Sequence, residues 1–141
     1  MWPFFLCKKE CHRKPVICRG INMKFKFSDS LKNNLDFQHV YKNGKSYANK
    51  YLIMYVLENN ENKNRLGISV SKKVGNSVVR HRITRLLRES YRLHENIFNS
   101  GLDIVVIAKS NASSISYWEA ESALLHLAKL HQIIKIYFYS D

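Results

Sequence analysis

The sequence predicts an α/β domain, a two-layer α+β sandwich in which helices cover a small mixed sheet. The expected order of elements is helix, strand, strand, helix, strand, helix. Two apolar, β-prone runs flank a polar loop within residues 47–71, a pattern typical of an antiparallel hairpin. A third apolar run at residues 103–108 follows a helix-like segment, and a strand–helix–strand succession over about 40 residues predicts that the flanking strands are parallel neighbours. The chain has 141 residues, which suits one domain with a substantial core.

The composition indicates a polyanionic partner, because the net charge is +12. No apolar run approaches the ~20 residues that a membrane span needs, so we expect no membrane partner. All three cysteines precede Met23, and the cysteine-free remainder fits a protein of the reducing cytoplasm.

Residues 1–22 differ from the rest of the chain, since they contain both prolines and all three cysteines and follow neither a helical nor a strand period. The apolar stretch at residues 2–6 is shorter than the roughly 7–15 residues of a signal-peptide core. The cysteines and His12 are of types that bind zinc, but their spacing matches neither a C-x-x-C pair nor a zinc finger. We therefore interpret residues 1–22 as an unstructured leader ahead of a folded domain at residues 23–132.

The first predicted element is a short helix within residues 30–44, for which Asn34 would be the N-cap and Gly44 the stop. Its apolar and aromatic side would carry Leu35, Phe37, Val40 and Tyr41. We expect Phe37 to join the core, whereas the phenol of Tyr41 has a polar tip that favours an exit to solvent.

The predicted hairpin consists of strands at residues 47–58 and 65–71, joined by the polar loop at residues 58–63. Alternate residues of the first strand would point to opposite faces of the sheet. One face would carry Tyr51, Ile53, Tyr55 and Leu57, and the other would carry Leu52, Met54 and Val56.

The stretch at residues 65–92 organises the chain, because a helix rich in arginine follows a Lys72–Lys73 pair and a Gly75–Asn76 break. Apolar residues spaced at intervals of three or four would form its buried side: Val79, Ile83, Leu86, Leu87 and Leu93. The opposite side would carry His81, Arg85, Arg88 and Arg92, with Arg80 and Arg82 on its flanks.

An ordinary solvated helix mixes lysine with glutamate, whereas this helix has five arginines and only one acid, Glu89. Arg80 and Arg82 also follow closely on the expected cap at Asn76 or Ser77, where the helix dipole favours anions instead. The guanidinium group binds phosphate through two parallel hydrogen bonds. This side of the helix is therefore predicted to bind nucleic acid.

The last predicted helix begins with a capping box, in which Ser116 is the N-cap and Glu119 the third helical residue, and it ends near His131. The tail at residues 133–141 contains the apolar, β-prone run IIKIYFY. The pattern leaves open whether this tail packs on the domain or stays exposed.

Three stretches together resemble the protein subunit of bacterial ribonuclease P: GISVSKKVGNSVVRHRITRLLRE at residues 67–89, LKNNLDFQHVYKNGKSYAN at 31–49 and GLDIVVIA at 101–108. The resemblance covers residues 23–132. The family motif Arg-Asn-Arg is matched by Arg80-His81-Arg82, so histidine replaces the asparagine between the two arginines. A lysine common in the family is replaced by Thr84.

The resemblance implies a ribonucleoprotein in which the RNA is the catalyst and uses Mg²⁺ to remove the 5′ leader of precursor tRNA. The protein would bind both the catalytic RNA and the leader, without an organic cofactor or an obligate protein partner. Catalytic-RNA contacts would fall on Lys72, Lys73, Asn76, Arg80, His81, Arg82, Arg85, Arg88 and Arg92. Leader contacts would fall between the first helix and the sheet, on Phe37, Tyr41 and Tyr55. Lys50 and Tyr51 would add a positive charge and an aromatic ring, both suited to single-stranded RNA. The resemblance also implies an unusual left-handed β-α-β crossover around the arginine helix.

Two other classes of function fit the sequence less well. A structural RNA-binding protein, such as a ribosomal protein, would share this composition but not the signature at residues 67–89. A protein-only nuclease would need convergent carboxylates to hold metal ions. The acids after Met23 are dispersed, so we predict no metal site and no catalytic residue in the protein itself.

Overall fold

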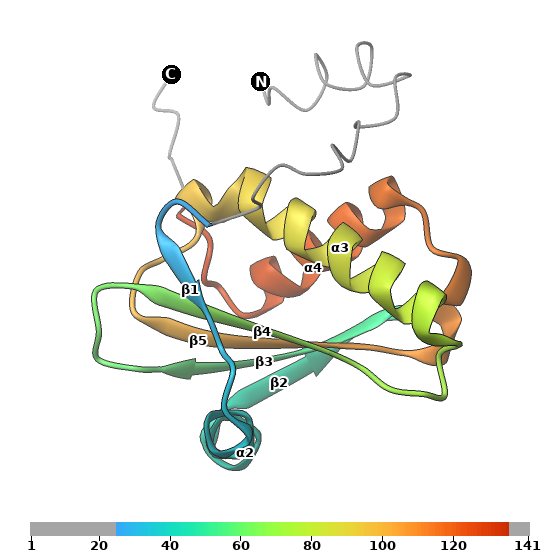
Figure 1. The fold of residues 1–141 in the computed structure, drawn as a ribbon. Coiled ribbons are helices and arrows are strands. Elements are labelled where there is room, and N and C mark those ends of the chain that lie inside the picture. Colours follow the sequence, from blue (N-terminus) through green and yellow to red (C-terminus); the bar gives the residue numbers. More distant parts are fainter. Residues whose placement is uncertain (1–24, 136–141) are drawn as a thin grey trace, which may run out of the picture.

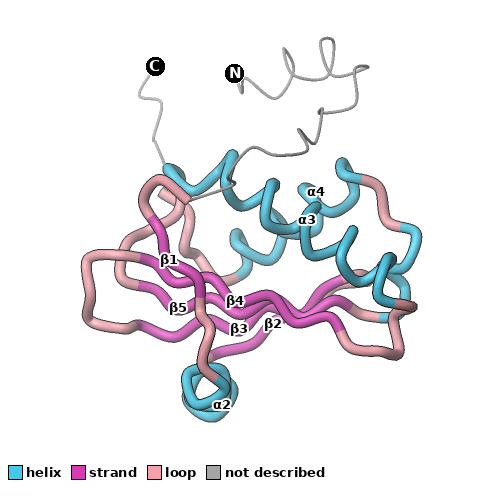
Figure 2. Tube along the Cα trace, in the orientation of Figure 1, coloured by secondary structure: helices cyan, strands magenta, loops and turns pink. Residues whose placement is uncertain are grey.

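The computed structural model describes residues 25–135, so the expected leader at residues 1–22 lies outside the described residues. A five-stranded sheet lies between one helix on one face and two helices on the other (Figures 1 and 2). The expected sandwich of a mixed sheet and helices is confirmed. Its elements are β1 (Ser28–Ser30), α2 (Asn34–Asn43), β2 (Lys45–Ala48), β3 (Leu52–Glu58), β4 (Asn64–Val70), α3 (Ser77–His94), the 3₁₀ turn η1 (Glu95–Ile97), β5 (Leu102–Ala108), the 3₁₀ turn η2 (Ser110–Ser114) and α4 (Tyr117–Leu130).

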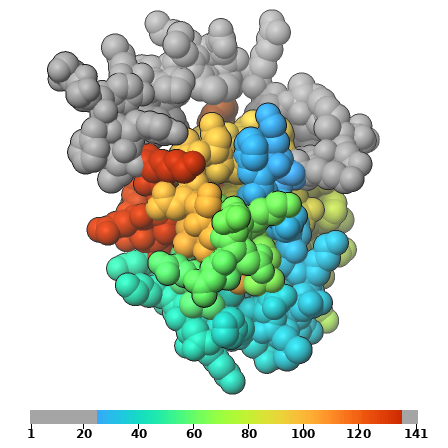
Figure 3. All heavy atoms as spheres, turned by 90° about the vertical axis from the view of Figure 1, so that its left-hand side faces the viewer, coloured from blue at the N-terminus to red at the C-terminus, as the bar shows by residue number. Residues whose placement is uncertain are grey.

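The strands lie in the order β1-β4-β5-β3-β2. β4 and β5 are parallel neighbours, as predicted. The predicted pairing of β3 with β4 is wrong, because β5 lies between them and pairs antiparallel with β3. β5 is buried on both faces and is apolar apart from Asp103, which suits a central strand. The loop after β3 crosses to β4, and the Asn59 N–H donates a hydrogen bond of 2.9 Å to the Gly101 carbonyl. Figure 3 shows this loop in green at the near end of the sheet.

The predicted order of elements lacked the two edge strands. All four residues of β2 are exposed, so they carry no alternating apolar pattern from which a strand could be predicted. The predicted strand at residues 47–58 is in fact broken at Asn49. The Asn49 side chain accepts hydrogen bonds from the backbone N–H groups of Tyr51 and Leu52 at 3.0 and 2.8 Å, and β3 begins only there.

The crossover from β4 through α3 to β5 is left-handed. In Figure 1 both strands run from left to right, α3 returns above them, and the β1 edge of the sheet is nearest the viewer. β5 therefore lies behind β4. About 98% of such crossovers are right-handed, so physical rules alone would have predicted the opposite hand.

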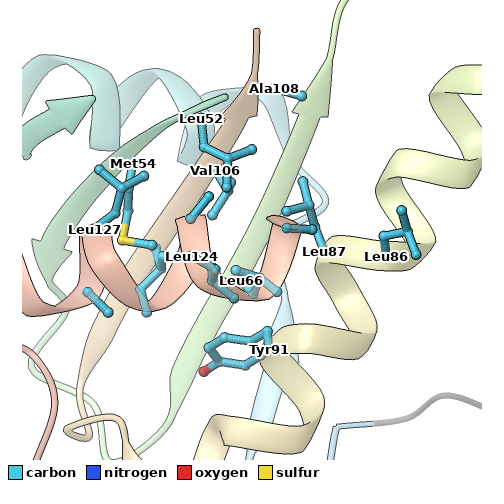
Figure 4. Packing of buried hydrophobic residues seen from close by; sticks show 14 of the residues in the cluster. Leu52, Met54, Leu66, Leu86, Leu87, Tyr91, Val106, Ala108, Leu124 and Leu127 are labelled. Atoms are coloured by element: carbon cyan, nitrogen blue, oxygen red, sulfur yellow. The ribbon is translucent and has the colours of Figure 1, made fainter. Parts of the chain in front are cut away.

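The larger core fills the space between the sheet and the α3–α4 layer (Figure 4). Leu52, Met54 and Val56 point into it, which confirms the alternation predicted for β3. Leu93 does not, since half of its surface is exposed. The last turn of α3 instead buries Tyr91, whose ring lies among the labelled leucines in Figure 4.

The edge strand β1 is anchored to the end of α3. The hydroxyls of Ser28 and Tyr91 lie 2.9 Å apart, and the buried carboxylate of Glu95 accepts hydrogen bonds from the backbone N–H groups of Lys26 and Phe27. Burial raises the pKa of the Tyr91 phenol, although the hydrogen bond with Ser28 acts in the opposite direction. The N-terminal end of the described chain is therefore fixed by polar contacts as well as by packing.

A smaller core lies under α2, on the other face of the sheet. Val40 is its buried helical residue, whereas Leu35, predicted on the same side, is 78% exposed. The N-cap is Asn33 and not Asn34, because the helix begins one residue earlier than predicted. Gly44 does follow the last helical residue, and its N–H donates to the Val40 carbonyl.

At the other end of the chain, α4 starts with the predicted capping box and ends at Leu130. Gln132 then adopts a left-handed conformation with φ of 57°. Ile133 is buried and Ile134 forms an isolated β-bridge with Phe98. The start of the tail thus packs on the domain, while residues 136–141 lie outside the described residues.

Candidate nucleic-acid interface

The arginine-rich helix α3 begins at a side-chain cap. The Asn76 side chain accepts a hydrogen bond from the Val79 backbone N–H at 3.0 Å, so the cap is Asn76, the first of the two predicted positions. No acid occurs in the first turn. Lys72 and Lys73 lie exposed in the turn that precedes the cap. The positive end of the helix dipole therefore meets further positive charge, an arrangement that favours a bound anion.

The arginine face consists of Arg80, His81, Arg82, Arg85, Arg88 and Arg92. Arg80, Arg85 and Arg88 make no hydrogen bond or ion pair within residues 25–135 through their side chains. The Nε atoms of Arg80 and Arg88 are buried, so only the outer ends of these two guanidinium groups can meet a ligand. His81 is exposed beside them. Unpaired guanidinium groups held side by side on a rigid helix are suited to binding successive phosphates.

Two members of the arginine face have partners within the protein. Arg92 forms a two-pronged ion pair with Glu89, with N–O distances of 2.9 and 2.5 Å. The hydrogen bond with Glu89 raises the pKa of Arg92 above its ordinary value. Arg82 donates a 2.6 Å hydrogen bond to the Ile115 carbonyl. Arg92 is therefore largely neutralised, and Arg82 also joins α3 to the start of α4.

A separate aromatic surface lies on the other face of the sheet, where α2 packs. The rings of Tyr41 and Tyr55 are 5.1 Å apart and nearly perpendicular, and the rings of Phe37 and Tyr41 are 6.3 Å apart. Tyr41 is partly exposed, and burial raises its pKa despite a hydrogen bond with Ser69. The structure thus brings together three of the five residues predicted to bind the leader.

The position of Phe37 depends on a glycine in the neighbouring strand. A Cβ atom built on Gly67 would lie 2.6 Å from Cζ of Phe37, far inside van der Waals contact. The ring can therefore lie directly on the backbone of β4 only because residue 67 has no side chain. Gly67 fixes how closely α2 approaches the sheet.

Lys50 and Tyr51 do not join the aromatic surface. The Lys50 ammonium lies 5.2 Å from the centre of the Tyr51 ring, and Tyr51 packs against the larger core on the α3–α4 side. The prediction that Tyr51 shares a face with Tyr55 is wrong. The alternation of side chains between the two faces begins only at Leu52, where β3 starts. Tyr51 precedes β3, in the turn formed by Asn49, so its side chain does not follow that alternation.

Three residues of the sheet extend the aromatic surface but were not among the predicted site residues, although Ile53 was predicted on the same face as Tyr55. Ser69 of β4, Ile107 of β5 and Ile53 of β3 lie side by side in the strand register, on the same face as Tyr55, and all are half-buried. Gly67, Val105 and Tyr55 form a row of neighbouring residues on the face that α2 covers. Ser69, Ile107 and Ile53 each lie two residues along the same strand from one of them. Alternation could have identified them once the strand order was known.

The buried carboxylates among residues 25–135 already have hydrogen-bond partners within the protein. Asp103 binds Arg65 through two hydrogen bonds of 2.8 and 2.6 Å and also accepts one from Asn59. Among residues 25–135, no group of three or more His, Cys, Asp or Glu side chains is placed to hold a metal ion. No helix in the part of the chain that the structure describes is long and apolar enough to cross a membrane.

The comparisons with known proteins agree with this geometry. The family model described as Ribonuclease P matches residues 25–132. The ribonuclease P protein component of Lachnoclostridium phytofermentans is 67% identical over 107 residues, which cover 76% of this chain and 92% of that protein. The corresponding protein of Alkaliphilus metalliredigens is 52% identical over 107 residues, covering 76% of this chain and 96% of the relative.

Solved structures of the same kind share the fold. The Staphylococcus aureus RNase P protein is 37% identical with a TM-score of 0.71, covering 76% of this chain and 98% of the other. The Thermotoga maritima RNase P protein is 32% identical with a TM-score of 0.67, covering 72% and 96%. On the match to the family model and on these identities, the chain belongs to the ribonuclease P protein family.

Proposed function

We propose that this chain is the protein subunit of a ribonuclease P, which binds the catalytic RNA through the arginine face and the 5′ leader of precursor tRNA through the aromatic surface. The observation that carries the proposal is the row of unpaired guanidinium groups on α3, within a chain of net charge +12. Family membership supports ribonuclease P RNA as the RNA that is bound.

The arginine face suits a folded RNA because such RNA is bound mainly through its phosphates and 2′-hydroxyls. The unpaired guanidinium groups of Arg80, Arg85 and Arg88, together with exposed Lys72 and Lys73, supply positive charge without competing acids. Asn76 and His81 add polar groups beside them. Arg82 and Arg92 contribute less, since each already has a protein partner.

The aromatic surface suits a single strand, whose bases stack on exposed rings. Tyr41 and Tyr55 meet edge to face, so part of each ring remains open to a further partner. A stacked base contributes roughly 1–3 kcal/mol. Lys50 and Tyr51 lie apart from this surface, so they would form a second, separate contact with the leader.

The chemical step would belong to the RNA, with Mg²⁺ held mainly by the RNA. Hydrolysis of a phosphodiester by the protein alone would need free carboxylates that converge on metal ions. Within residues 25–135, the carboxylates of Glu89, Glu95, Asp103 and Glu121 are each engaged by protein donors. The positive charge of the protein would instead screen phosphates and lower the Mg²⁺ concentration that the RNA requires. We propose that this takes place in the cytoplasm, with precursor tRNA as the substrate.

The proposal is tested by cleavage of a precursor tRNA with the protein alone, with the cognate ribonuclease P RNA alone, and with both. We expect no cleavage by the protein alone, and cleavage by the two together at a lower Mg²⁺ concentration than by the RNA alone. Cleavage by RNA-free protein in Mg²⁺ would refute it.

A second pair of substrates separates the two surfaces. Tyr55→Ala should weaken binding of precursor tRNA by the assembled enzyme but leave binding of mature tRNA, which has no leader, unchanged. Arg85→Ala should weaken binding of the catalytic RNA itself. A Tyr55→Ala variant that bound both tRNAs as the wild type does would exclude the aromatic surface as the leader site.

A further inference from the structure

The first turn of α4 lies against the helix that carries the arginine face. The guanidinium of Arg82 is bonded to the carbonyl of Ile115, just ahead of α4. Farther along, Nε2 of His94 lies 3.0 Å from the carboxylate of Glu121. These two contacts hold the start of α4 alongside α3, and Tyr117 of this turn interacts electrostatically with Arg92 of the arginine face.

Trp118 is the large apolar side chain of this turn that the fold does not bury. Its side chain is 39% exposed, whereas Ala120 and Leu124 of the same helix are buried. The Tyr117 ring supports it from one side, with ring centres 5.1 Å apart and planes at 84°. The indole N–H makes no hydrogen bond within residues 25–135.

The position of Trp118 is fixed by the helix start. Ser116 accepts a hydrogen bond from the Glu119 backbone N–H, and the Glu119 carboxylate accepts one from the Ser116 N–H at 2.9 Å. This capping box holds the backbone on both sides of the tryptophan. An aromatic ring that is fixed in advance loses little conformational freedom when a ligand stacks on it.

We propose that Trp118 is a stacking platform for an unpaired base of the RNA that the arginine face binds. The inference rests on the proposed function, because phosphates held by α3 would bring bases to the start of α4. The charge of the neighbouring helix favours this occupant over an apolar protein surface, since Arg82 reaches the Ile115 carbonyl just ahead of α4 and Arg92 interacts electrostatically with Tyr117. The interface would then extend from α3 onto α4 and combine charge with stacking.

Tryptophan fluorescence provides a direct test. The chain has two tryptophans, so Trp2→Phe in the full-length protein leaves Trp118 as the sole source of indole emission. Titration with the cognate ribonuclease P RNA should quench this emission and protect the indole from acrylamide, because a stacked base both quenches and shields the ring.

Affinity at several salt concentrations tests the energetic role. Trp118→Ala should weaken RNA binding about tenfold, in the range expected for one stacked base. The slope of log affinity against log salt should not change, because no charge is removed, whereas Arg85→Ala should reduce that slope by about one. Trp118→Phe, which retains a ring, should restore most of the affinity.

Leu130→Ala is the matched control, since Leu130 is a similarly exposed apolar residue on the last turn of the same helix. It should bind RNA as the wild type does. Tight binding of RNA with unchanged Trp118 emission, or equal affinities for wild type and Trp118→Ala, would overturn the stacking inference and leave the proposed function standing. A wild-type protein that did not bind the RNA at all would overturn both.

Discussion

His94 on α3 and Glu121 on α4 form a largely buried ion pair that joins the two helices of the layer. Nε2 of His94 faces the carboxylate at 3.0 Å, and Nδ1 faces the Ser90 carbonyl at 2.8 Å. Both ring nitrogens therefore face acceptors, so the doubly protonated ring satisfies both contacts. Burial lowers the pKa of His94, but the hydrogen bonds to Glu121 and Ser90 and the charge of Glu121 outweigh it, and the pKa is raised above 6.5.

This pair predicts a pH-dependent stability. Since the folded-state pKa is above the unfolded value, its contribution is fully present below about pH 6.5 and is lost as the pH rises through the folded pKa. Glu121→Gln should lower the free energy of unfolding by about 1–2 kcal/mol at pH 6 and by less at pH 9. Urea unfolding of both proteins at the two pH values measures this. An equal loss at both values would show that the pair does not titrate in this range.

Gly67→Ala should displace Phe37, because the added Cβ would lie 2.6 Å from its ring. Overpacking of this kind costs about 1–3 kcal/mol, so the thermal midpoint should fall. Binding of precursor tRNA should weaken more than binding of mature tRNA, since α2 carries Phe37 and Tyr41. The double variant Gly67→Ala, Phe37→Ala makes room for the methyl group. If it were destabilised by the sum of the two single losses, the proposed clash would be absent.

Gln132→Gly should stabilise the protein, because residue 132 adopts φ of 57°, a conformation that costs an L side chain about 1 kcal/mol and glycine almost nothing. The free energy of unfolding should increase by up to about 1 kcal/mol, with a thermal midpoint higher by a few degrees. Gln132→Ala is the control, since it removes the amide and retains the Cβ atom. A glycine variant no more stable than the alanine variant would contradict this reasoning.

The features that could be predicted from the sequence are those specified by nearby residues. The Asn76 cap, the capping box at Ser116 and Glu119, and the buried stripe of Ile83, Leu86 and Leu87 all depend on spacings of three or four residues. The structure confirms each of them. The prediction of a basic side on α3 follows from the same spacing, and its role in RNA binding stays a prediction.

The features that could not be predicted depend on contacts between distant segments. The strand β5 lies between β3 and β4 and is buried on both faces, but nothing in the loop after β3 specifies that crossing. The edge strands β1 and β2 lack an alternating apolar pattern. Tyr51 does not lie on its predicted face of the sheet, because the Asn49 side chain forms a turn there. The partner of Arg82, a carbonyl 33 residues away, could be seen only in the structure.

The pairing of Arg92 with Glu89 has a consequence for how the molecule meets its ligand. It leaves the unpaired arginines of α3 within the first two-thirds of the helix, on the side of Lys72 and Lys73, where the backbone dipole is also positive. This charge adds to the dipole of the α3 backbone. A polyanion should therefore be attracted first to the start of α3, before close contacts form. Added salt should accordingly slow association more than it speeds dissociation.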